Sequence, residues 1–262
     1  APHHAPVGSR MARELLWQAG MCGTRELIAR RETICRLIRY HSFPPHAIDT
    51  VDVARRLHRI AAEGRLLPDF SLRLLCLLAK ADMLGRVCDD KEQMLEQVAL
   101  CEELGKEESC LEKCFGFPSD YTMRSYLNGR DVWKDQMLYD DTWGKVYLMS
   151  GLPGTGKDTW IQKNLPDIPM ISLDEIRRQQ KVAPTKNQGL IANLAKEQAK
   201  EYLRRHQSFV WNATNITQTM RQQLIALFEG YKASVRIVYL ETDWHTLLSR
   251  NTSREAASRI RG

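Results

Sequence analysis

The feature that most constrains the fold is a glycine-rich segment in the second half of the chain, GLPGTGK at residues 151–157. A short apolar run, VYLMS, precedes it, and a helical pattern resumes from Trp160 to Asn164. In a G-x-x-x-x-G-K loop, glycines let backbone N–H groups surround phosphate oxygens, the lysine reaches the outer phosphates, and the following helix adds its positive end. Because strand, loop and helix come in this order, the segment predicts a nucleotide-phosphate site. The residues expected to hold the nucleotide are Gly151, Pro153, Gly154, Thr155, Gly156, Lys157, Asp158 and Thr159.

The rest of this half alternates between candidate strands and candidate helices. After the strand before the loop, strands are expected at 170–172, 208–211 and 234–240, with helices at 189–205 and 217–230. Such alternation is typical of an α/β fold with a mostly parallel sheet and helices on both faces. We therefore expect an α/β domain over residues 145–262.

The first part of the chain has a different pattern. From Val7 to about Gly105, apolar residues recur at helical spacing, and glycine and proline turns separate the runs. This predicts an all-α domain over residues 1–106. Between 107 and 144 the periodicity weakens into an aromatic and polar stretch, which predicts a connecting segment packed on one or both domains.

Composition and charge narrow the class of protein. Hydrophobic residues make up 43% and charged residues 27% of the 262 residues, which is ordinary for a globular protein. No apolar run approaches the roughly 20 residues that cross a bilayer, and the first ten residues carry no apolar signal core, so we expect a cytoplasmic protein without a membrane partner. From residue 145 onward, 18 Lys+Arg face 10 Asp+Glu, an excess that favours polyanionic partners.

The loop departs from the usual pattern at one position. Asp158 follows the lysine, where a serine or threonine hydroxyl usually binds Mg²⁺. A carboxylate can bind Mg²⁺ directly or through water. Either Asp158 replaces the hydroxyl or Thr159 shifts into its place, and a third interpretation is that Asp158 only complements the positive end of the helix.

Charged residues beyond the loop are candidates for phosphate chemistry. Asp174 follows the second expected strand, and strand ends are where open α/β sheets bind ligands. Its carboxylate could accept a hydroxyl proton, and Arg177, one turn on, could hold a substrate phosphate. The alternative is an Asp that caps a helix beside a solvated Arg. Arg250 and Arg254 share one helix face and could neutralise charge on a transferring group, or could form an exposed basic helix end.

At these residues the chain resembles a known family. The segments GLPGTGKDTW, SLDEIRR, WNATNITQTMRQQLI and LLSRNTSRE are similar to the P-loop polynucleotide kinases, RNA and DNA end-healing enzymes that move the γ-phosphate of ATP to a 5′-hydroxyl end. The resemblance covers about residues 143–255. It implies ATP and Mg²⁺, 5′-OH RNA or DNA ends as acceptors, and nucleic-acid ligase or repair partners. The roles it implies are β/γ-phosphate binding by Lys157, general base for Asp174, acceptor-phosphate contact for Arg177, and a lid arginine at Arg250 or Arg254.

Two features differ from that family. Asn212, in WNATN, stands where related kinases often carry an aspartate at a strand end, so the resemblance does not carry a magnesium role to this position. The chain also stops at Gly262, where such domains usually continue.

The first part resembles a second family. The segments His4 to Gly8, Arg39-Tyr40-His41 and AKADMLGR at 79–86 are similar to the later portion of HD-type metal-dependent phosphohydrolase domains, of the kind attached to some tRNA nucleotidyltransferases. The resemblance implies metal-ligand positions at His4, His41 and Asp82. The family's earlier His and its adjacent His-Asp pair have no counterpart, so we expect a partial and inactive HD-like domain, and a chain truncated at both ends.

Three functions stay open on the sequence. The leading interpretation is an ATP-dependent polynucleotide 5′-hydroxyl kinase. The second is a kinase of the same fold that acts on a small-molecule hydroxyl. The third is a nucleotide-binding interaction module without transfer activity, whose helical half is the partner surface.

Overall fold

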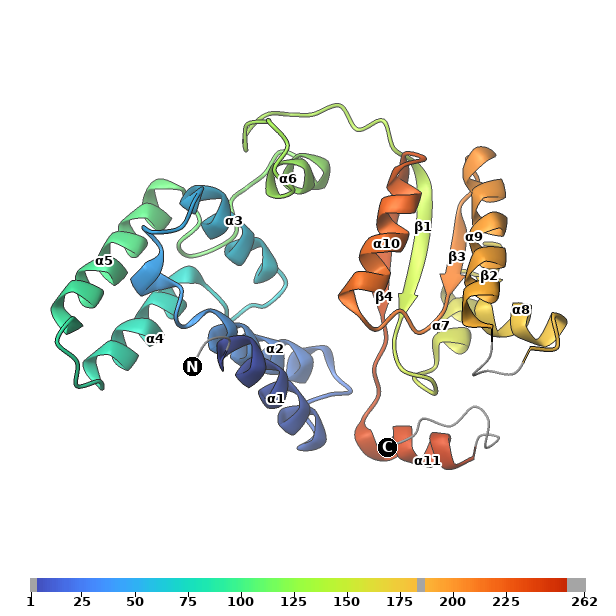
Figure 1. Cartoon of the computed structure of the whole chain (residues 1–262), viewed down its shortest axis with the longest axis horizontal. Coiled ribbons are helices and arrows are strands. Elements are labelled where there is room, and N and C mark those ends of the chain that lie inside the picture. Colours follow the sequence, from blue (N-terminus) through green and yellow to red (C-terminus); the bar gives the residue numbers. More distant parts are fainter. Residues whose placement is uncertain (1–3, 183–186, 254–262) are drawn as a thin grey trace. The chain divides into compact units, whose positions relative to one another are not determined.

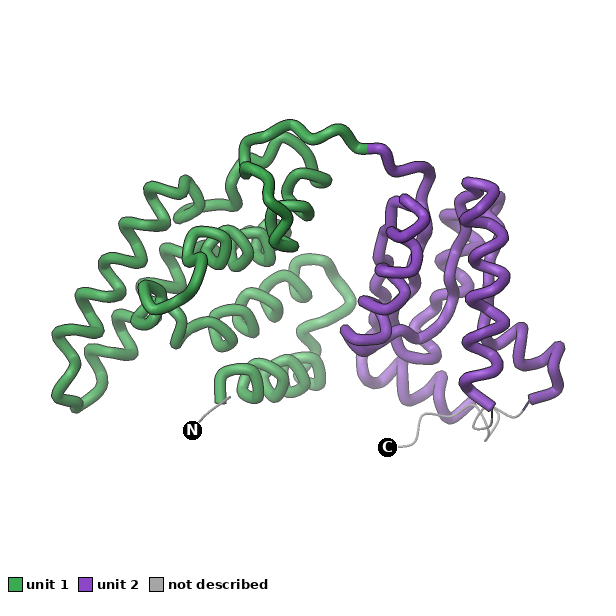
Figure 2. The backbone as a smooth tube through the Cα atoms, turned by 45° about the horizontal axis from the view of Figure 1, so that its top comes forward, with its two compact units in different colours: residues 1–140 green, residues 141–262 purple. Residues whose placement is uncertain are grey.

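The computed structural model describes residues 4–182 and 187–253. The chain divides into two compact units, residues 1–140 and 141–262 (Figure 2). The first unit therefore includes most of the segment 107–144. Among the described residues, no helix is both long and apolar enough to span a bilayer.

The regular elements of the first unit are helical, as the sequence predicts (Figure 1). Four of them begin at residues whose side-chain oxygen accepts a hydrogen bond from a backbone N–H of the first turn: Thr24, Asp52, Ser71 and Ser119. The elements are α1 (His4–Gln18), α2 (Arg25–Tyr40), η1 (Pro44–His46), α3 (Val53–Glu63), α4 (Leu72–Leu84), α5 (Lys91–Glu107) and α6 (Asp120–Leu127).

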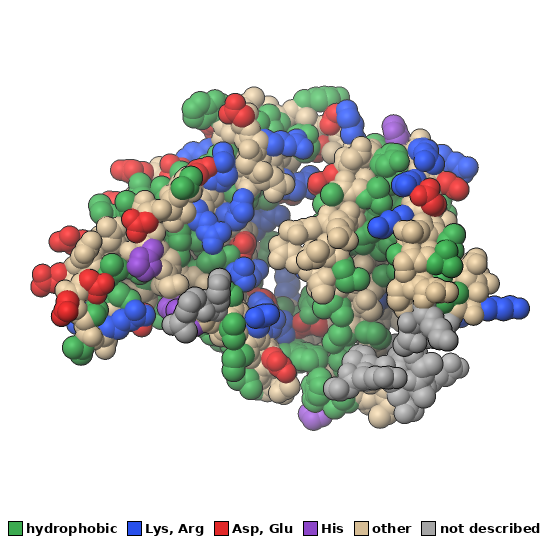
Figure 3. Space-filling view, viewed as in Figure 1, with side chains coloured by type: hydrophobic (Ala, Val, Ile, Leu, Met, Phe, Trp, Pro, Cys, Tyr) green, Lys and Arg blue, Asp and Glu red, His purple; other side chains and the backbone are tan. Residues whose placement is uncertain are grey.

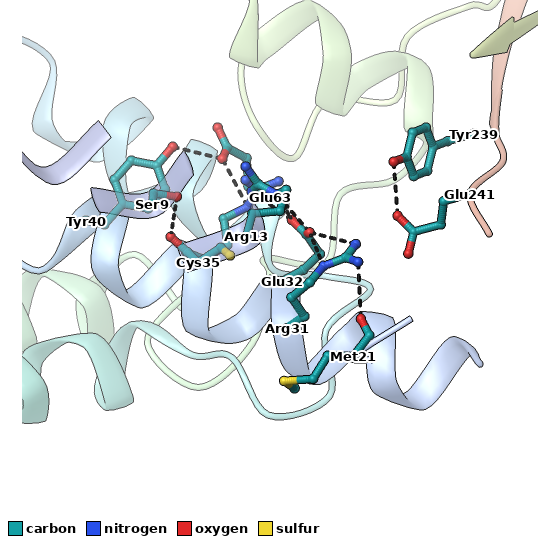
Figure 4. A network of polar contacts seen from close by, with 11 residues as sticks. Ser9, Arg13, Met21, Arg31, Glu32, Cys35, Tyr40, Glu63, Tyr239 and Glu241 are labelled. Atoms are coloured by element: carbon teal, nitrogen blue, oxygen red, sulfur yellow. Dashed lines mark hydrogen bonds and ion pairs between the residues drawn. The ribbon is translucent and has the colours of Figure 1, made fainter. Parts of the chain in front are cut away.

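A polar network joins α1 to α2 beside the apolar core of this unit (Figure 4). Arg13 on α1 donates from Nε and Nη2 to the two carboxylate oxygens of Glu32 on α2, and both hydrogen bonds are 2.9 Å long. The buried guanidinium of Arg31 also pairs with Glu32, at 3.2 Å. Because a buried charge is costly without a partner, the Glu32 carboxylate stabilises the buried Arg31 and, through Arg13, links α1 to α2.

Charge is segregated within the first unit. Residues 25–65, which contain α2 and α3, carry nine Lys+Arg and five Asp+Glu, whereas residues 66–140 carry nine and fifteen. Figure 3 shows acidic side chains gathered toward α5 and basic ones toward α2 and α3. A polyanion would therefore be repelled from the surface of α5.

The aromatic segment is anchored to the first unit through a buried histidine. His58 on α3 is fully buried, and its Nε2 lies 2.8 Å from Oε2 of Glu108. The rings of Phe115, Phe117 and Tyr126 pack around the imidazole with centroids 5.3, 5.8 and 5.6 Å away. This cluster explains why residues beyond Glu107 fold back on the helices.

We expect the first unit to lose stability as the pH falls below about 6.5. Burial lowers the pKa of His58 from its ordinary value of 6.5, against the opposing effect of Glu108. Below about pH 6.5 His58 is therefore protonated more readily in the unfolded chain than in the folded one. The free energy of unfolding then decreases as the pH drops through 6.5. Chemical unfolding measured from about pH 8 to about pH 5 checks this.

The matched variants for this prediction are His58→Gln and His46→Gln. His46 is an exposed histidine at the end of η1. The loss of stability below pH 6.5 should shrink in His58→Gln and persist in His46→Gln. An equal pH dependence in both variants would contradict the assignment to His58.

The second unit is an α/β fold, as the sequence predicts. Its four described strands form a parallel sheet in the order β2-β3-β1-β4. Its elements are β1 (Trp143–Ser150), α7 (Lys157–Asn164), β2 (Met170–Ser172), α8 (Leu173–Gln179), α9 (Gln188–Arg204), β3 (Phe209–Asn212), α10 (Gln218–Glu229), β4 (Ala233–Tyr239) and α11 (Trp244–Thr252).

Alternating residues of β1 face two different cores, because successive side chains of a strand point to opposite faces. Leu148 belongs to the larger core, with Ile191 and Leu203 of α9 and Phe228 of α10. Met149 belongs to a smaller core with Ile161 of α7. Helices α9 and α10 therefore cover one face of the sheet and α7 covers the other (Figure 1), which brings the loop between β1 and α7 to the carboxyl ends of the strands.

Candidate functional site

The glycine loop connects β1 to α7, and its backbone explains the glycines. Gly151 has φ +155°, and a Cβ there would lie 2.4 Å from the carbonyl oxygen of Leu240. Gly156 has φ +89° and caps α7 in the left-handed region, which residues with a Cβ rarely adopt. A side chain at Gly151 would thus push the loop away from the segment that follows β4.

Lys157 is held inside this loop. Its Nζ donates to the carbonyl oxygens of Gly151 and Leu152, both at 2.9 Å. The ammonium group therefore lies beside the N-terminus of α7, where the backbone N–H groups already favour an anion. The loop, the lysine and the helix end together form a positively charged concave surface.

A cleft of about 2080 Å³ runs past this loop at the carboxyl ends of the strands. Every residue that lines it belongs to the second unit. Among the residues predicted from sequence, the cleft is lined by Pro153, Gly154, Gly156, Lys157, Asp158, Thr159, Asp174, Arg177 and Arg250. Gly151 and Thr155 belong to the same loop but do not line the cleft, and Arg254 lies outside the described residues.

Asp174 and Arg177 lie together on α8, a short helix that begins directly after β2. Oδ1 of Asp174 accepts from Nη1 of Arg177 at 2.6 Å, and the other end of the guanidinium donates to Oε1 of Gln188 at 2.7 Å. The Asp174 side chain is 77% exposed and that of Arg177 is 20% exposed. Ser172 caps the helix by accepting from the N–H of Glu175, so the alternative of an N-cap Asp174 is wrong.

Arg250 reaches the loop from α11. Its Nη1 donates to the carbonyl oxygen of Gly154 at 3.0 Å. The helix begins at Asp243, whose carboxylate accepts from the N–H of Thr246 at 2.8 Å, and this backbone hydrogen bond lowers the pKa of Asp243. A guanidinium is thus fixed at the mouth of the loop.

Asn212 ends β3 and contacts the unusual residue of the loop. Asn212 is 6% exposed, and its Nδ2 donates to Oδ1 of Asp158 at 2.6 Å. Asp158 lies in the first turn of α7. The WNATN segment carries no sequence signal for this contact, and the sequence likewise does not predict Gln188 as the partner of Arg177.

One comparison with known protein families matches the part of the chain that contains this loop. A family model described as an AAA domain matches residues 146–261, which contain the loop, the cleft and most of the sheet. This match and the strand, loop and helix around Lys157 give the second unit the features of a P-loop domain. A chain from "Structure of Pnkp1/Rnl/Hen1 complex" is similar at 17% identity and a TM-score of 0.40, over 44% of this chain and 41% of that one. This chain thus spans less than half of that solved chain. The search of curated proteins found no match to this chain.

The residues at the glycine loop fit a bound Mg²⁺ ion. Asp158 and Thr159 are both among the residues that line the cleft next to Lys157, and each carries a side-chain oxygen. Mg²⁺ prefers oxygen ligands and is usually held by one or two carboxylates together with substrate phosphates and waters. A full protein cage is therefore not needed, and one carboxylate beside the phosphate site is sufficient.

Of the three metal positions implied for the first unit, the structure brings two together, His4 and His41, and no metal site forms among the described residues. The Nε2 atoms of His4 and His41 lie 3.2 Å apart, and Nδ1 of His41 lies 2.7 Å from the carbonyl oxygen of Ile38. Asp82 instead pairs with Arg86, one turn along α4. Over residues 4–182 and 187–253, no group of three or more His, Cys, Asp or Glu side chains could hold a metal.

Proposed function

We propose that the P-loop domain transfers the γ-phosphate of ATP to a 5′-hydroxyl end of RNA or DNA. The observation that carries this proposal is the shared cleft, in which the loop lysine, the Asp174 carboxylate and two arginines face one space. A site for one small molecule usually measures roughly 300–1,000 Å³. The cleft, at about 2080 Å³, has room for a nucleotide and for the end of a second, larger substrate.

In the proposed reaction, Asp174 accepts the proton of the attacking 5′-hydroxyl. The alcohol oxygen forms a bond to the γ-phosphorus as the bond from that phosphorus to the β–γ bridging oxygen breaks, and ADP leaves. Asp174 suits this role because its side chain is open to the cleft and is oriented by Arg177. A positioned base of this kind contributes about 10²–10⁴-fold to the rate.

The cationic groups bind and orient the phosphates. Lys157 and the N-terminus of α7 face the outer phosphates of ATP, and Arg250 neutralises charge on the transferring group from the mouth of the loop. Arg177 holds the phosphate nearest the acceptor end, because each of its two Nη atoms carries a second N–H beyond the one donated to Asp174 or Gln188. Bound Mg²⁺ would supply further neutralisation of the phosphate oxygens.

The charge of the domain supports a polynucleotide acceptor. The 18 Lys+Arg against 10 Asp+Glu from residue 145 onward attract a polyanion. The family match is consistent with a phosphotransferase and does not distinguish a polynucleotide from a small alcohol.

The test offers γ-labelled ATP together with each of three acceptors. These are oligonucleotides with a 5′-hydroxyl, the same oligonucleotides with a 5′-phosphate, and a panel of small alcohols. We expect label on the 5′-hydroxyl oligonucleotide alone. Label on a small alcohol alone would support the small-molecule kinase, and ATP binding without any transfer would support the interaction module.

A further inference from the structure

The contact between Asp158 and Asn212 bears on whether Asp158 or Thr159 binds Mg²⁺, which the sequence leaves open. Asn212 is almost fully buried, yet its side chain lines the cleft and donates to Asp158 at 2.6 Å across 54 residues of sequence. Its Nδ2 also lies 3.5 Å from Sδ of Met170. A buried amide is normally satisfied by such hydrogen bonds, so the orientation of Asn212 is fixed by its surroundings.

This pair reverses the charges that P-loop domains usually show. In most of them, a neutral serine or threonine hydroxyl follows the loop lysine and an aspartate at a strand end completes the magnesium site. Here the carboxylate is on the loop and the neutral side chain is on the strand. The number of carboxylates at the two positions is the same, and only their places are exchanged.

Helix geometry selects Asp158 over Thr159. Both lie in the first turn of α7, where consecutive side chains point about 100° apart. Asp158 points at the end of β3, as its hydrogen bond to Asn212 shows, so Thr159 points elsewhere. Thr159 therefore does not shift into the position of the usual hydroxyl.

We propose that Asp158 is the magnesium-binding residue of this loop, and that Asn212 is a positioning residue that holds one carboxylate oxygen so that the other faces the nucleotide phosphates. An amide suits this position because a second carboxylate at 2.6 Å would repel the first, whereas an N–H donor stabilises it. The inference rests on the ATP binding of the proposed function and does not depend on the acceptor.

The test exchanges the two side chains. The affinity for a fluorescent ATP analogue is measured with Mg²⁺ and with EDTA in the parent, Asp158→Ser, Asn212→Ala and the double variant D158S/N212D. The quantity compared is the gain in affinity that Mg²⁺ produces. We expect this gain to fall about 10-fold or more in Asp158→Ser and in Asn212→Ala. It should return in D158S/N212D, which restores the usual arrangement.

The control is Asp167→Ser, an exposed aspartate after α7 that does not line the cleft. It should keep the parent's magnesium gain. Affinity in EDTA close to that of the parent shows that a variant is folded. The proposal is overturned if the parent has no magnesium gain, if Asp158→Ser keeps it while Thr159→Ala loses it, or if folded D158S/N212D is no better than Asp158→Ser.

The readout also separates this inference from the proposed function. A parent that follows the expected magnesium pattern but labels no oligonucleotide would refute the kinase assignment and leave the roles of Asp158 and Asn212 intact. The reverse result, transfer to a 5′-hydroxyl with an unchanged magnesium gain in Asp158→Ser, would refute only the inference.

Discussion

Replacing Asp174 with alanine is expected to slow transfer to a 5′-hydroxyl oligonucleotide about 10²–10⁴-fold while ATP still binds. The carboxylate lies on α8, apart from the loop that holds Lys157; its side chain is 77% exposed, and the residue lines the cleft. Its removal takes away the proton acceptor and leaves the loop unchanged. Single-turnover transfer, measured beside the affinity for an ATP analogue, separates the two effects.

The neighbouring pair on α8 provides a closely matched control. Glu175 pairs with Arg178 at 2.6 Å with the same three-residue spacing that joins Asp174 to Arg177. Glu175→Ala removes a carboxylate of the same charge from the same turn. It should retain most of the transfer rate. Equal losses in the two variants would show that the helix contributes only general charge and that Asp174 is not the base.

The parts of the site that were predictable from sequence are local. The strand, loop and helix around Lys157 are contiguous, and their glycines are required by backbone geometry that the spacing already implies. The position of Asp174 followed from the rule that parallel strands end at one edge. The contacts of Asn212 with Asp158 and of Gln188 with Arg177 join residues 54 and 11 positions apart, so they depend on the packing of separate elements, which periodicity does not encode.

The structure of the aromatic segment after Glu107 also depends on contacts between residues far apart in the sequence. Its weak periodicity predicted a connection, and the structure forms α6 within it. What orders this segment is the contact between His58 and Glu108, 50 positions apart, together with the rings that surround the imidazole. A lone histidine on an apolar helix face carries no signal of such a partner. Tertiary contacts therefore decide the structure here.

Replacing Lys157 with alanine is expected to lower transfer about 10²–10³-fold, the effect of removing one preorganised donor from a charge-stabilising site. Unlike the change at Asp174, it should also weaken ATP binding. Nζ of Lys157 is the group that the loop carbonyls hold beside the helix end, so its loss removes charge where the outer phosphates would lie. Equilibrium binding of an ATP analogue and single-turnover transfer measure the two effects.

Two further lysine variants test whether ATP binding and transfer depend on the position of the Lys157 ammonium group or only on its charge. Lys163→Ala, at the other end of the same helix, should leave both ATP binding and transfer near the parent values. Lys157→Arg keeps the charge, but a planar guanidinium is larger than an ammonium and presents its donors in a fixed plane. It should therefore not fit between the two carbonyl oxygens that accept from Nζ, and activity should stay low. Full activity in Lys157→Arg would mean that the loop requires only a positive charge, and the positioning assigned to the loop carbonyls would be wrong.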